Sequence, residues 1–186
     1  QPHAGYRPGP AADLTNPNLL SDTLADANLR DANLYNANLR GANLAGASLD
    51  GADLTGANLN NADVSGANLA NADLTNANLT NADLTNSNLT GANLTNADLS
   101  LASLTGASLR NAVMIGAQLR NSDLTSAHLP GADLTGATLS DANLSDTNLS
   151  NANLSNANLT NANLTGVNLS DVCLLYTSPS PRDSDS

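Results

Sequence analysis

The sequence predicts an all-β solenoid, in which the chain winds into a stack of short coils. Leu recurs at every fifth position from Leu14 to Leu174, giving 33 units in which only Val64 and Met114 replace it. Ala stands two residues before this position in 26 of the 33 units, and most units end in Asn, Gly or Asp. We expect Ala and Leu to point inward and the last residue of each unit to form a corner.

The five-residue period excludes the two common regular structures. In an α-helix, successive leucines would lie about 140° apart around the axis and would form no apolar stripe. In a straight strand they would alternate between the two faces, because five is an odd number. A short extended piece followed by a corner keeps every Leu on the inside, and repeated corners of one hand wind the chain into a coil.

The repeated unit, of which residues 72–76 (Ala-Asp-Leu-Thr-Asn) are typical, resembles those of the pentapeptide-repeat family over residues 12 to about 172. The resemblance implies a right-handed quadrilateral β-helix with four units per coil, about eight coils and no insertions. At a strand spacing near 4.8 Å the rod would be about 40 Å long. Each unit is too small to fold alone, so stability would come from stacking neighbouring coils.

The two ends depart from the repeat. Residues 1–11 contain three prolines and are predicted to be a flexible lead before the β-helix of residues 12–172. Residues 173–186 form a non-repeat tail that resembles translated adapter or vector sequence, which would leave 32 genuine units. Alternatively, the tail is genuine and Leu174, Leu175 and Tyr176 form a small cap. Family members often carry a capping or dimerising element here, so a dimer through the C-terminal end is expected if that end is native.

The composition limits the partners. The chain has no Phe, Trp, Lys or Glu, and its 17 Asp against 6 Arg give a net charge of −11. We therefore expect neither direct nucleic-acid binding nor attachment to anionic membranes, both of which need a basic surface. No apolar run approaches the roughly 18 residues of a membrane span, and the single Cys173 excludes an intramolecular disulfide.

The chain carries no recognisable catalytic, cofactor-binding or metal-binding set. His3 and His128 stand alone, without companions at metal-ligand spacing. No nucleophile motif or phosphate-binding loop is present, and a rod without insertions offers no cleft to perturb a carboxylate. The sequence predicts a protein that is not an enzyme and needs no cofactor.

Four units per coil would stack residues that are 20 apart. One wall would then carry a column of threonines, interrupted by Tyr35 and Ile115, beside a column of aspartates. A candidate interaction surface follows: Thr55, Thr75, Thr95, Thr135, Asp53, Asp73 and Asp133. On the same reading, Asp63, Asp83 and Asp123 would make the opposite wall acidic as well.

The least regular unit is a second candidate. Val113 and Ile115 should face outward on the threonine wall, and Leu101 is expected at a nearby corner. Together they would form an exposed apolar patch suited to a protein partner. The alternative is drift in a tolerant repeat, with Met114 filling the Leu position as a flexible side chain.

The leading functional interpretation is a structural or protein-interaction scaffold whose protein partner is unknown. An alternative comes from the resemblance, since some family members, including quinolone-resistance proteins, bind DNA gyrase or topoisomerase IV as acidic rods. Those proteins often have Phe in the core and carry loops, which this chain lacks. The second alternative is ice binding, because regular Thr, Asn and Asp arrays on a flat wall can order water.

Overall fold

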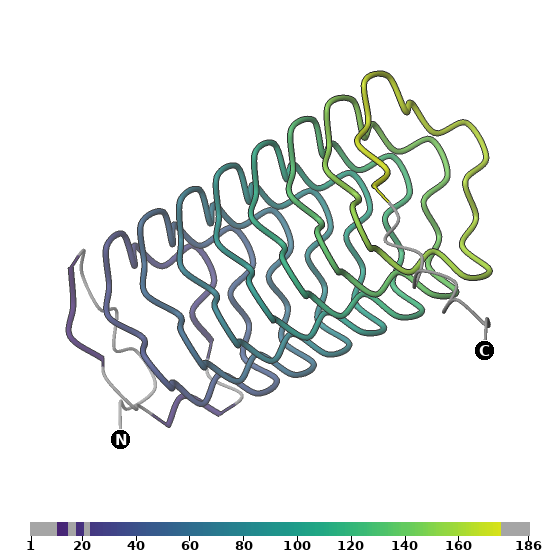
Figure 1. The fold of residues 1–186 in the computed structure, drawn as a ribbon. Helices are drawn as coiled ribbons and strands as arrows, with labels where there is room; N and C mark the ends of the chain where they lie inside the picture. The colour runs from purple at the N-terminus through teal and green to yellow at the C-terminus, as the bar shows by residue number, and fades with distance from the viewer. Residues whose placement is uncertain (1–10, 15–17, 21–22, 176–186) are drawn as a thin grey trace, which may run out of the picture.

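A computed structural model describes residues 11–14, 18–20 and 23–175, and in it the chain winds around a single axis with each coil stacked on the one before (Figure 1). Parallel β-bridges join residues 20 apart, as from Asn33 to Asp53 and from Asp53 to Asp73. One coil therefore contains four five-residue units. The predicted lead, apart from Ala11, and tail residues 176–186 lie outside the described residues.

The sequence predicted β structure, and the described residues contain parallel bridges but no continuous strand and no helix. The second residue of each unit, such as Asp73 in the unit 72–76, is the bridged one. The last residue of every unit from Asp26 to Asp171 has φ between 51° and 70°. This left-handed conformation turns the chain after every extended stretch, which leaves each stretch too short to make a strand.

Backbone hydrogen bonds account for four of the five N–H groups in a typical unit. In the unit 72–76, Asp73 N–H donates to the Ala52 carbonyl of the preceding coil at 2.9 Å. Leu74 and Asn76 donate to carbonyls of the following coil at 2.7 and 3.0 Å, and Ala72 closes the turn with Leu69 at 3.1 Å. These bonds run along the rod and tie each coil to both neighbours.

The side chain of the second residue satisfies the remaining N–H. The amide of Thr75 donates to Asp73 Oδ1 at 2.9 Å. Asn at the second position does the same, as where Thr95 N–H donates to Asn93 Oδ1 at 3.1 Å. The preference for Asn and Asp at this position therefore has a backbone cause, because a short side chain with an acceptor oxygen is required.

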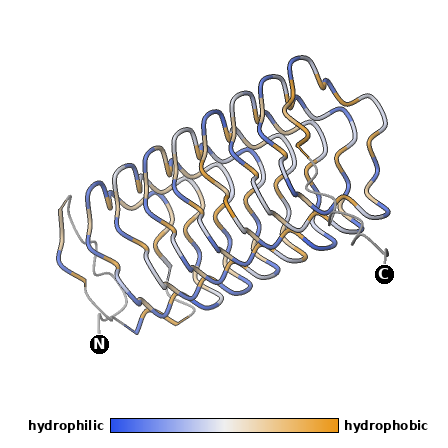
Figure 2. Ribbon diagram, in the orientation of Figure 1, coloured by the Kyte–Doolittle hydropathy of each residue, from blue (hydrophilic) through white to orange (hydrophobic). Residues whose placement is uncertain are grey.

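The inward residues form one continuous core. Core-position side chains from Leu29 to Leu149 are at most 1% exposed, including those of Val64 and Met114. Along each coil, apolar segments alternate with polar ones (Figure 2). The core opens at the last described coil, where Leu164 and Leu169 are 41% and 44% exposed.

We number the four walls by their inward residues. Walls 1, 2, 3 and 4 contain Leu34, Leu39, Leu44 and Leu49 respectively, together with the units 20 residues before and after each. Walls 1 and 3 lie opposite each other in this cyclic order, as do walls 2 and 4. The bridges of wall 1 continue to Cys173, one residue beyond the boundary that the sequence suggested.

Candidate functional site

Wall 1 carries the predicted Thr–Asp surface, and its side chains form hydrogen-bonded chains that cross the coils. Thr75 Oγ1 donates to Asp73 Oδ1 at 2.6 Å and accepts from Asn93 Nδ2 at 2.9 Å. Thr95 Oγ1 in turn donates to Asn93 Oδ1 at 2.7 Å. The network holds the hydroxyls and amides of two consecutive coils in fixed positions.

A second stretch of the same kind lies further along wall 1. Thr135 Oγ1 donates to Asp133 Oδ1 at 2.5 Å and accepts from Asn153 Nδ2 at 2.9 Å. Ser155 Oγ continues the chain by donating to Asn153 Oδ1 at 2.6 Å. Thr55 also lies on this wall, and its N–H donates to Asp53 Oδ1 at 2.9 Å.

Val113 and Ile115 separate the two polar stretches. Their unit sits in regular register, since Val113 is bridged to Asn93 and Asp133 and Met114 is fully buried. The side chain of Ile115 is 40% exposed. Neither Val113 nor Ile115 can extend the side-chain network, so the wall has an apolar break in the middle of a polar surface.

Leu101 does not join this break. It is the corner residue between walls 2 and 3, in line with Asn81 and Asn121, so wall 2 separates it from wall 1. Its side chain is 56% exposed, and its φ of 62° is unusual for a residue other than Gly, Asn or Asp. The sequence identified Leu101 as exposed, and the structure places it on a different part of the surface from Val113 and Ile115.

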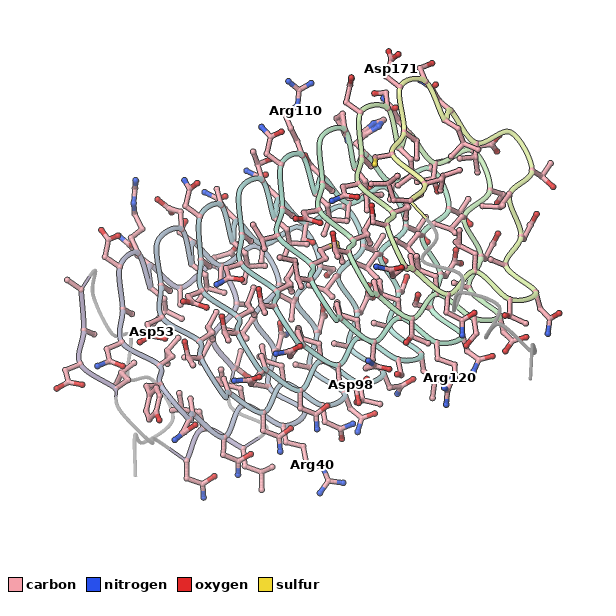
Figure 3. The ribbon with its side chains drawn as sticks, in the orientation of Figure 1. Arg40, Asp53, Asp98, Arg110, Arg120 and Asp171 are labelled. Atoms are coloured by element: carbon pink, nitrogen blue, oxygen red, sulfur yellow. The ribbon has the colours of Figure 1, made fainter. Side chains whose placement is uncertain are left out.

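Charge is segregated by wall. All four described arginines lie on walls 2 and 4, and Arg110 projects from the opposite side of the rod to Arg40 and Arg120 (Figure 3). Arg30 on wall 4 pairs with Asp50 in the next coil at 2.7 Å. The described parts of walls 1 and 3 carry aspartates and no arginine, apart from the corners. The rod thus presents two acidic faces opposite each other.

Wall 3 contains a column of hydroxyls, of which the sequence pointed to three, Ser65, Thr85 and Thr125, outside the candidate interaction surface. Six successive coils present Ser or Thr at the fourth position of the unit: Ser65, Thr85, Thr105, Thr125, Ser145 and Thr165. Thr125 Oγ1 donates to Asp123 Oδ1 at 2.6 Å and accepts from Asn143 Nδ2 at 2.8 Å, and it lies 3.4 Å from Ser145 Oγ, the next hydroxyl of the column. The same steps of 20 residues add Thr105, Ser145 and Thr165 to these three, and the column has no interruption like that of Ile115.

The described residues hold no group of three or more His, Cys and Asp that could bind a metal ion. Cys173 has an exposed free thiol. The part of the chain that the structure covers has no helix long and apolar enough to cross a bilayer.

Comparison with known proteins gives the family. A model of pentapeptide repeats matches residues 23–61, 62–100, 102–141 and 142–174, as eight copies. HetL, a pentapeptide repeat protein involved in heterocyst differentiation regulation in the cyanobacterium Nostoc sp. strain PCC 7120, is 32% identical, with 92% of each chain covered and a TM-score of 0.44. A trypsin-treated form of QnrB1, a plasmid-mediated fluoroquinolone resistance protein, is 23% identical, with 89% of this chain and 91% of that chain covered and a TM-score of 0.49.

A shorter match is a pentapeptide repeat protein from the thylakoid lumen of Arabidopsis thaliana, 32% identical over 56% of this chain and 66% of that chain, with a TM-score of 0.23. No curated protein sequence matches the chain significantly. The family model spans well over half of the sequence, and its repeats coincide with the bridged units of the solenoid. The chain belongs to the pentapeptide repeat family.

Proposed function

We propose that the protein is a non-enzymatic scaffold that binds a protein partner on wall 1. The observation that supports this most directly is the apolar break at Val113 and Ile115 within an ordered polar wall. Exposed apolar residues surrounded by polar ones are typical of protein contact sites. The scaffold in this proposal is a right-handed rod of about eight coils without insertions.

Affinity capture tests the proposal. The double variant Val113→Asn/Ile115→Thr restores the usual unit on wall 1, so it should fold at least as well as the natural chain. Gln118→Asn/Arg120→Thr introduces the same two residues at the same positions of the next unit, on wall 2, and is the control. The natural chain and the control should retain the same protein from an extract, and the wall 1 variant should lose it. Equal capture by all three would contradict a binding role for wall 1.

An acidic DNA mimic is an alternative function. It has weaker support than the scaffold, because the rod carries fewer negative charges per unit length than DNA. B-DNA carries one negative charge per about 1.7 Å of axis, which is about 23 charges over a rod of about 40 Å. The described residues provide 14 aspartates, divided between opposite walls and the corners. Inhibition of DNA supercoiling by gyrase at micromolar protein would favour this alternative, and no inhibition would remove it.

Ice binding is a second candidate because of the hydroxyl column on wall 3. Its six Ser and Thr residues recur once per coil, with a spacing of about 4.8 Å. The aspartates Asp63, Asp83 and Asp123 beside it would bind water strongly and disturb such an array. Thermal hysteresis that is lost in Thr105→Leu/Thr125→Leu would support this function, and hysteresis equal to that of buffer would end it.

Self-association through the last described coil is a further proposal. Leu164 and Leu169 occupy core positions and are 41% and 44% exposed, so a second copy could cover them. Light scattering of the 186-residue chain should then show a dimer, which Leu164→Asn/Leu169→Asn should convert to a monomer. A monomer at all concentrations would contradict the proposal.

A further inference from the structure

The break at Val113 and Ile115 is a feature of the surface and leaves the underlying sheet intact. Val113 N–H donates to the Ala92 carbonyl at 2.9 Å, and Met114 N–H donates to the Asp133 carbonyl at 2.7 Å. These are the same backbone bonds that neighbouring units make, and the core residue Met114 is fully buried. The two outward residues are therefore held on a part of wall 1 with regular backbone pairing.

Val113 also changes the hydrogen bonding of the backbone. In the units before and after it on wall 1, the second residue accepts from the amide two residues later: Asn93 from Thr95 at 3.1 Å and Asp133 from Thr135 at 3.0 Å. Val113 has no oxygen in its side chain, so the Ile115 N–H lacks this acceptor. The wall consequently presents a backbone donor beside two β-branched apolar side chains.

Aspartates lie on both sides of the break. Asp133 is one coil away from Val113, at about 5 Å along the rod, and Asp73 is two coils away in the other direction, at about 10 Å. Asp53 lies one coil beyond Asp73. The described part of wall 1 has no arginine that could neutralise them. An acidic partner would be repelled from this face and a basic one attracted.

We propose that wall 1, from Asp53 to Asp133, binds an extended basic segment of a partner protein that places one apolar side chain on Val113 and Ile115. An extended chain advances about 3.3 Å per residue. A Lys or Arg two residues to one side of the apolar residue could therefore reach Asp133, and one about three residues to the other side could reach Asp73. A carbonyl of the segment could accept from the Ile115 N–H. This inference rests on the proposed scaffold function and adds the chemistry of the partner to it.

Three synthetic peptides of ten residues test the chemistry. The first has a central Leu with two Lys on each side in a Ser background, the second has Ser in place of Leu, and the third has Glu in place of Lys. Fluorescence anisotropy with the full chain should show binding of the first peptide, about tenfold weaker binding of the second because one apolar contact is lost, and none of the third. Equal binding of the first two peptides would overturn the role of the apolar break.

Variants of the protein locate the binding site. Val113→Asn/Ile115→Thr should weaken binding of the first peptide about tenfold. Asp133→Asn should weaken it several-fold, whereas Asp123→Asn, the same change on wall 3, should leave it unchanged. Equal losses for Asp133→Asn and Asp123→Asn would show nonspecific attraction to an acidic rod and overturn the proposal. If the capture experiment retains a partner on wall 1 while the first peptide fails to bind, the partner chemistry is wrong and the scaffold function stands.

Discussion

At the scale of single residues, each position of the repeat must meet a different structural requirement. The last position must adopt positive φ, which Gly, Asn and Asp tolerate best. The second position must accept a hydrogen bond from the amide two residues later. His128 is an exception at the second position, and the residue two places later is Pro130, which has no N–H to donate. The missing acceptor at His128 therefore leaves no N–H without a partner, because Pro130 has none.

Leu101 is a corner residue whose type does not suit its backbone. Its φ of 62° costs a branched apolar side chain about 1–2 kcal/mol, and the side chain is 56% exposed, so it gains little from burial. We expect Leu101→Asn to raise the free energy of unfolding by about 1 kcal/mol, as measured by chemical denaturation. Asn would also stand between Asn81 and Asn121, in a corner column where Asn81 Nδ2 donates to Asn61 Oδ1 at 2.6 Å.

Leu99→Asn is a control for this prediction, because it places the same residue type in the core of the adjacent wall. It should destabilise the protein strongly, since Leu99 is fully buried. A loss of stability in Leu101→Asn would mean that the exposed Leu makes contacts that outweigh the backbone strain.

At the scale of the five-residue unit, most of the fold could be predicted from the sequence. The inward positions of Ala and Leu and the corner at the last position follow from the period of five, and the structure confirms both. The absence of continuous strands was not predicted, because it depends on how sharply each corner turns. The expectation that Leu101 lies near Val113 and Ile115 was wrong, although four units per coil already place its corner between walls 2 and 3, with wall 2 between it and wall 1.

The contribution of each unit to stability depends on the coils on both sides of it. Leu104 is fully buried between neighbouring coils, whereas Leu164 is 41% exposed. Leu104→Ala should cost about 2–5 kcal/mol, as for a buried Leu whose removal leaves a cavity, and Leu164→Ala should cost less than about 1 kcal/mol. Thermal or chemical unfolding of the two variants measures the difference, and similar losses would indicate that Leu164 is covered in solution, as a dimer would cover it.

At the scale of the whole molecule, the repeat places charges of the same sign on top of each other, just as it does side chains of the same type. Asp53 and Asp73 are bridged to each other on wall 1, and Asp63 and Asp83 are bridged on wall 3. Directly paired like charges destabilise a sheet, and the net charge of −11 adds repulsion over the whole rod. The hydrogen bond from the amide two residues later needs only one acceptor oxygen, which Asn supplies as well as Asp. The negative charges of the stacked aspartates are therefore not needed for the fold.

Salt should therefore stabilise the rod. Raising NaCl from about 0.05 to about 0.5 M shortens the Debye length to about 4 Å, below the coil spacing of about 4.8 Å. We expect the melting temperature to rise by a few degrees. Asp73→Asn keeps the acceptor oxygen for Thr75 and removes one of two stacked charges, so it should melt higher than the natural chain at low salt and respond less to added salt. Asp98→Asn is the control, because Asp98 is bridged to Asn78 and Gln118 and has no acidic residue paired with it. If Asp73→Asn and Asp98→Asn behave alike, overall net charge rather than stacking of carboxylates determines the salt response.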